Sequence, residues 1–126
     1  MLPSLQGLPE LWQTLYRGRG FMLRAVAREP RAAATSRAEA AVQARRGDIL
    51  DFKAFSNLAL NLLVEIEAAA VVGLADELEG LGWPVELEPP RQALLARAGE
   101  RLEGTVRLDF PDGDGELVIP LPRVPG

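Results

Sequence analysis

The side chains best suited to hold a ligand surround Pro30, where an alternating run of residues gives way to a helical pattern. Arg28 and Glu29 precede this proline, and Arg31 follows it. Proline is favoured in the first turn of a helix. The free N–H groups of that turn, together with arginine side chains, bind carboxylates and phosphates. We therefore predict that Arg28, Glu29 and Arg31 contact a small anionic ligand. The alternative is that these arginines only flank a helix, as arginines do for many reasons.

Glutamates are the other candidates for chemistry. They occur in two pairs, Glu65 with Glu67 and Glu86 with Glu88. Because residues two apart on a strand point to the same face, each pair could share one environment and support acid–base catalysis. Such a role predicts at least one carboxyl pKa far from its ordinary value. The interpretation that we favour is a solvated sheet face on which these carboxylates pair with Arg24 and Arg28.

The composition removes the usual catalytic and metal-binding groups. The 126 residues include no cysteine and no histidine, so disulfides, thiolate chemistry and the commonest general base are excluded. The segment 112–116, Asp-Gly-Asp-Gly-Glu, has the residue types of a calcium loop but lacks the later glutamate of an EF-hand. A hairpin turn is therefore favoured there. We expect no catalytic residue, no metal and no cofactor.

The charge balance and hydropathy exclude further classes of partner. A net charge of −4 argues against binding to nucleic acid, which normally requires a basic surplus. The segment 17–20, Arg-Gly-Arg-Gly, is interpreted as a connector. The chain starts without a basic segment followed by an apolar run, and no apolar segment reaches the roughly 18 residues of a membrane span. We expect neither nucleic-acid nor membrane partners, and a cytoplasmic location.

Hydrophobic periodicity predicts the order strand, helix, strand, strand, helix, strand between residues 21 and 88. Apolar residues recur at every second position from Leu58 to Ile66, as in a half-buried strand. The predicted elements are strand 21–28, a helix from Pro30 to a glycine cap at Gly47, a strand around Phe52 joined through Ser56 and Asn57 to strand 58–66, helix 68–81 closed by Gly82, and strand 85–88.

Further elements are predicted on either side of this central segment. Residues 8–16 have the apolar spacing of a short helix. After Pro89 and Pro90, a helical stripe from Leu94 to Leu102 is expected to end at Gly104. Apolar and polar residues alternate in segments 105–110 and 116–121, on either side of a turn at 111–115. This pattern predicts a terminal hairpin.

These elements predict one α+β domain over residues 1–126. Right-handed crossovers close residues 21–88 as a ferredoxin-like βαββαβ fold, a four-stranded antiparallel sheet with two helices on one face. Residues 8–16 add an N-terminal helix, and residues 89–126 add a helix and a β-hairpin.

Residues 21–88 resemble an ACT or ACT-like domain. The resemblance rests on the helix that ends at Gly47, the strand that follows it, the strand 60–66, the helix ending near Gly82 and the strand 84–87. ACT domains are typically regulatory modules that bind amino acids or other small ligands, often where subunits meet. Their first turn usually carries an Asp-x-Pro-Gly-like motif. The segment 28–32, Arg-Glu-Pro-Arg-Ala, keeps the proline and lacks the glycine.

The resemblance implies a non-enzymatic regulatory domain that senses a small anionic ligand or amino acid and acts as a homo-oligomer. A dimer is expected, formed through sheet edges or through Gly73 and Gly80 of the second helix. A structural or protein-interaction module without a ligand, including a PII-like trimer, is the alternative. An enzyme that uses the glutamates is the least favoured hypothesis.

Overall fold

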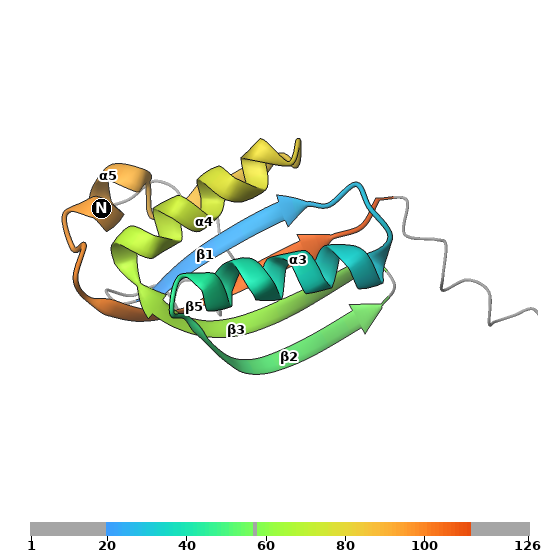
Figure 1. Cartoon of the computed structure of the whole chain (residues 1–126), viewed down its shortest axis with the longest axis horizontal. Helices are drawn as coiled ribbons and strands as arrows, with labels where there is room; N and C mark the ends of the chain where they lie inside the picture. The colour runs from blue at the N-terminus through green and yellow to red at the C-terminus, as the bar shows by residue number, and fades with distance from the viewer. Residues whose placement is uncertain (1–19, 57, 112–126) are drawn as a thin grey trace, which may run out of the picture.

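A five-stranded mixed β-sheet forms the centre of the structure, a computed structural model that describes residues 20–56 and 58–111. Three helices accompany the sheet in this part of the chain, so the predicted α+β class is confirmed. Figure 1 shows α3 and α4 side by side over the sheet. The elements are β1 (Gly20–Val26), α3 (Arg31–Ala44), β2 (Asp48–Ser56), β3 (Ala59–Glu67), α4 (Ala68–Gly80), β4 (Val85–Glu88), α5 (Arg91–Leu95) and β5 (Arg101–Asp109).

The alternation predicted for β3 is confirmed over most of the strand. Leu60, Leu62, Val64 and Ile66 are fully buried, and the side chains between them point to the other face, as the strand period requires. Leu58 is the exception, because it lies in the turn before β3 and is 53% exposed.

The two predicted helices are also present. Helix α3 buries Ala34, Ala38 and Ala41, and helix α4 buries a larger stripe that includes Leu74 and Leu78. Gly82 closes α4 with a φ of 90°, a conformation that favours glycine. The residue with positive φ after α3 is Arg46, at 63°, and not the predicted Gly47.

The sheet order differs from the predicted one because β5 lies inside the sheet. The order is β2-β3-β5-β1-β4. Strand β5 pairs in parallel with β1 and antiparallel with β3, so the sheet is mixed. Residues 105–110 were predicted as part of a terminal hairpin. Residues 105–109 do lie in a strand, β5, but its described partners are β1 and β3. The other half of that hairpin, the 112–116 turn and the helix predicted at 8–16 lie outside the described residues.

The prediction of a helix that ends at Gly104 is wrong beyond the first turn of that helix. Helix α5 spans only Arg91–Leu95, whereas Leu102 and Gly104 belong to β5. A Cβ atom at Gly104 would overlap the ring of Phe21 on the neighbouring strand. Gly104 therefore leaves room for a buried aromatic side chain, which is a known use of glycine within a strand.

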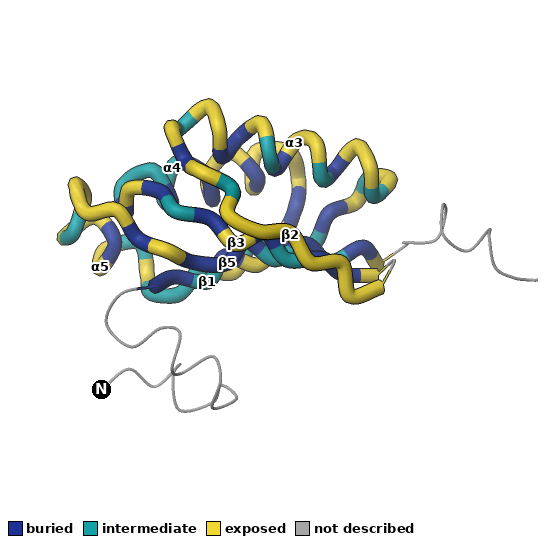
Figure 2. The backbone as a smooth tube through the Cα atoms, turned by 90° about the horizontal axis from the view of Figure 1, so that it is seen from below, coloured by how far each residue is buried: buried dark blue, intermediate teal, exposed yellow. Residues whose placement is uncertain are grey.

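The sheet has two unequal faces and two edges. Leu23, Leu62 and Val106 point toward α3 and α4 and are completely buried. The opposite face carries mainly polar side chains, and β2 and β4 form the edges. Figure 2 shows β2 exposed along its length. No helix in the described residues is long and apolar enough to span a membrane.

We predict that Gly104→Ala destabilises the domain because its methyl group would overlap the Phe21 ring. Overpacking of a core typically costs about 1–3 kcal/mol, and chemical denaturation of both proteins would measure the difference. Phe21→Leu should recover part of the loss when combined with Gly104→Ala. Gly80→Ala is the matched control, because nothing lies within 4 Å of its Cβ position. Equal unfolding free energies for Gly104→Ala and the wild type would contradict the packing described here.

Candidate functional site

The predicted anion site lies where β1 leads into α3. Arg28 is exposed and follows β1 by two residues, and Pro30 is the N-cap residue of α3. The cap has no side-chain hydrogen bond, and the first turn contains no acidic residue. The first N–H groups of α3 are therefore left without a side-chain acceptor, and their partial positive charge favours an anion.

Glu29 is held by a neighbouring arginine. Arg37 Nε, one helical turn and a half into α3, donates to both Glu29 carboxylate oxygens at 3.0 and 2.8 Å. This ion pair ties the Glu29 carboxylate to α3. Glu29 therefore stabilises the turn, and contact between its carboxylate and an anion is disfavoured by charge.

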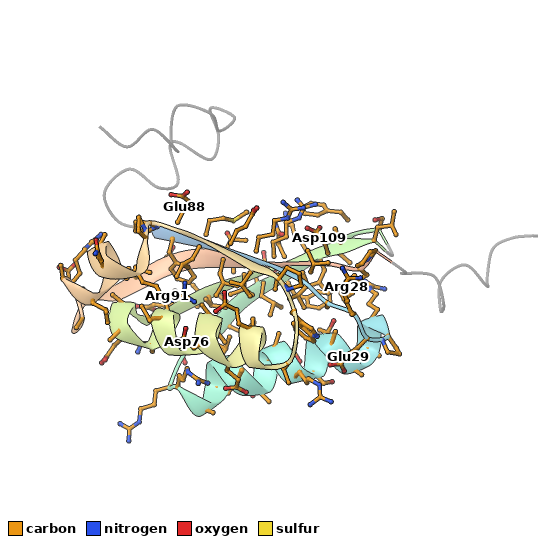
Figure 3. The ribbon with its side chains drawn as sticks, turned by 90° about the horizontal axis from the view of Figure 1, so that it is seen from above. Arg28, Glu29, Asp76, Glu88, Arg91 and Asp109 are labelled. Atoms are coloured by element: carbon orange, nitrogen blue, oxygen red, sulfur yellow. The ribbon has the colours of Figure 1, made fainter. Side chains whose placement is uncertain are left out.

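The two predicted arginines have no carboxylate partner within the described residues. Neither Arg28 nor Arg31 takes part in an ion pair there. The Nε atom of Arg31 is buried and makes no hydrogen bond in this structure. Figure 3 shows Arg28 and Glu29 at the end of the molecule where α3 begins. An uncapped helix start and two unpaired cations thus meet in one region.

The open face of the sheet carries an arginine–aspartate network that sequence periodicity did not reveal. Asp109 accepts hydrogen bonds from Arg24 Nε at 2.5 Å and from Arg107 Nε at 3.0 Å. The hydrogen bond and the charge of Asp109 raise the pKa of Arg24, with a smaller contribution from Glu86. The Arg107 guanidinium also lies 6.0 Å from the Phe55 ring centre. These mutually satisfied charges favour a structural role.

The glutamate pairs do not meet in one site. Strands β5 and β1 separate β3, which carries Glu65, from β4, which carries Glu86. Glu65 pairs with Arg101 at 3.6 Å, and Glu86 pairs with Arg24 at 3.4 Å. Nor do the described residues contain a cluster of three or more metal-ligating side chains. The arrangement offers solvated ion pairs across strands. The predicted pairing with Arg24 is found for Glu86, whereas Glu65 pairs with Arg101, and Arg28 has no ion pair among the described residues.

The glycines of α4 are not equivalent. A Cβ atom on Gly73 would lie 3.1 Å from Arg45 Nε. Arg45 is fixed there by hydrogen bonds to the Ala41 carbonyl and the Glu77 carboxylate. Gly73 thus has a close neighbour within its own chain, whereas nothing lies within 4 Å of the Cβ position on Gly80.

The most exposed apolar surface lies on the β2–β3 hairpin. Seven large apolar side chains are exposed among the described residues, and five of them belong to this hairpin. Their exposed fractions are 45% for Leu50, 46% for Phe52, 58% for Phe55, 53% for Leu58 and 36% for Leu63. Alternation identified β2 as a strand, but it did not indicate that β2 is an edge with both sides accessible.

The outer edge of β2 is open to a further strand. As the terminal strand of the sheet, β2 has a neighbour only on the β3 side within the described residues. The N–H group of Phe52 donates to the Asp51 side chain, Oδ1, at 2.8 Å. A side chain of the same strand thus occupies an amide that could bond another strand, and long apolar edges of this kind commonly pair with a further chain.

Comparison with known proteins adds no family assignment. No family model matches the chain, and no curated protein sequence or solved structure matches it. The β2 edge and the amino end of α3 are therefore the features of the molecule from which a function can be inferred.

Proposed function

We propose that this chain is a non-enzymatic interaction domain that works as a homodimer joined through the edge of β2. The observation that carries the proposal is the exposed apolar hairpin surface, centred on Phe52 and Phe55. A nine-residue edge strand with exposed aromatic side chains is costly to leave in water. Pairing with another strand would bury these side chains and supply partners for the backbone groups of the edge.

The strand arrangement supports a relationship to ferredoxin-like and ACT-like domains. Without β5, the order would be β2-β3-β1-β4, with α3 after β1 and α4 after β3. This is the ferredoxin-like order, and β5 is then an added strand between β1 and β3. The resemblance of residues 21–88 to ACT domains fits such an arrangement and favours a regulatory role.

A second candidate function is the sensing of a small anion or amino acid at the start of α3. The specific observation in its favour is that Arg31 Nε is buried without a hydrogen-bond partner, beside an uncapped helix terminus. Arg28 supplies a second cation. Arginine binds carboxylate and phosphate groups through paired N–H donors. In this arrangement Glu29 positions Arg37 and does not contact the ligand.

An enzymatic role has the least support. The candidate acid and base are the two members of each glutamate pair, and one member of each pair, Glu65 or Glu86, already forms an ion pair with an arginine. General acid–base catalysis requires both groups within reach of one substrate. The β2 edge and the α3 terminus provide binding surfaces, and neither brings such a pair together.

The dimer proposal predicts that Phe52→Ser converts a dimer into a monomer. Native mass spectrometry and light scattering at a matched concentration would measure the mass, and circular dichroism would verify the fold. Leu95→Ser is the matched control, because Leu95 is 52% exposed but lies on α5, away from β2. The wild type and Leu95→Ser should remain dimeric. A monomeric wild type, or a dimer unaffected by Phe52→Ser, would reject the β2 edge.

The anion proposal predicts that the double variant Arg28→Ala, Arg31→Ala loses affinity for inorganic phosphate by at least about tenfold, because charged hydrogen bonds are removed. Isothermal titration calorimetry would measure the affinity. The control is Arg97→Ala, which removes an arginine that pairs with Glu100 at another site. The wild type and this control should bind equally well. Unchanged phosphate affinity in the double variant would remove the site from consideration.

A further inference from the structure

Two opposite charges on β2 have no ion-pair partner within the described residues. They are Asp51 and Lys53, the latter being the only lysine in the chain. Both are exposed. By contrast, Arg24, Arg101 and Arg107, which also lie on the sheet, each pair with a carboxylate. The charges at the β2 edge are therefore available to a partner.

The two charges lie on the same side of a regular stretch of strand. Asp51 is opposite Leu63, and Lys53 is opposite Asn61 on β3. The residue between them, Phe52, is opposite the buried Leu62 and so belongs to the helix-covered face. Register shifts occur on either side, between Ile49 and Asp51 and between Ala54 and Ser56. The regular stretch is thus short and is centred near Phe52.

We propose that β2 pairs antiparallel with β2 of a second copy. The twofold axis that relates the two copies passes midway between their two Phe52 residues, which lie opposite each other. The inference rests on the proposed homodimer and assigns its register. Each Asp51 then lies opposite Lys53 of the second copy, which gives two symmetric ion pairs on the open face. The two Phe52 side chains meet on the helix-covered face. One continuous sheet results, with five strands from each copy and the helices of both on one side.

Other registers are less favourable. An axis through Asp51 or through Lys53 would place like charges directly opposite each other, which destabilises an antiparallel pair. An axis through Leu50 or Ala54 would leave both charges opposite uncharged residues. Opposing residues in an antiparallel pair share a face, whereas neighbouring residues of one strand point to opposite faces. The axis must therefore pass between the two copies of one residue. Phe52 alone within this stretch matches each charge with its opposite.

The hydrogen bond of Phe52 fits the same register. Its N–H group is directed to Asp51 Oδ1 in the single chain. In the dimer this N–H would donate to the Phe52 carbonyl of the second copy, and the reciprocal bond would form by symmetry. Asp51 would then be released from its own backbone to pair with Lys53 across the axis.

Charge reversal tests the register directly. Asp51→Lys places lysines opposite each other, and Lys53→Asp places aspartates opposite each other. Each reversal replaces two attractive contacts by two repulsive ones, so each variant should dissociate at least about tenfold more readily than the wild type. An equimolar mixture of the two variants should form a heterodimer, because both contacts across the axis then become attractive. The double variant Asp51→Lys, Lys53→Asp should form a homodimer again.

Sedimentation equilibrium would give the dissociation constants, and native mass spectrometry would separate heterodimer from homodimer by mass. Glu103→Lys is the matched control for charge, because Glu103 is exposed on β5 and has no ion pair among the described residues. This variant should dimerise as the wild type does. A wild-type dimer that is lost in Phe52→Ser but insensitive to both reversals would keep the β2 interface and overturn the Phe52 register. A monomeric wild type would overturn both proposals.

Discussion

The packing of the Phe21 ring over Gly104 is the contact on which the arrangement of the sheet depends. It lets β1 and β5 lie in parallel register along seven residue pairs with a buried aromatic side chain between them. On its other side, β5 pairs with β3 along nine residues. Strands β2 and β4 are the edges of this sheet, as they would also be in the order β2-β3-β1-β4 without β5. The position of β5 therefore widens the centre of the sheet and leaves β2 as an edge that a further strand can pair with.

The stability of β2 comes mainly from one neighbour. Only Ile49 of this strand is partly buried, so β2 contributes little to the core beneath α3 and α4. Its backbone pairs with β3 through a ladder interrupted by two register shifts. Edge strands in this position are often protected by charges or bulges, and Lys53 and the register shifts are such features. Yet Leu50, Phe52 and Phe55 remain exposed, and a second β2 would give them an apolar environment.

The sequence predicted the individual helices and strands more reliably than the order of the strands in the sheet. Alternation in β3 and the helical stripes of α3 and α4 are local patterns, and the structure contains each of them. The place of β5 depends on pairing between residues about 80 positions apart, such as Phe21 and Gly104, which no local period encodes. Gly104 was interpreted as a helix end for this reason. Likewise, Arg28 and Glu29 were correctly placed beside α3, but the pairing of Glu29 with Arg37 requires the helix geometry.

A regulatory role would require the α3 terminus and the β2 edge to influence each other, and helix α3 provides a physical connection. The helix begins at the proposed anion site, and only three residues, 45–47, separate its end from β2. At that junction a Cβ atom on Gly47 would lie 2.7 Å from Val42 Cγ1 and 3.0 Å from Ile66 Cδ1, so the chain has little room to move independently. An anion that displaced α3 would therefore also displace β2. By linkage, dimer formation would then change anion affinity by the same factor as the anion changes dimer affinity. A domain with both sites but no such coupling would be a constitutive dimer that binds anions, and not a sensor.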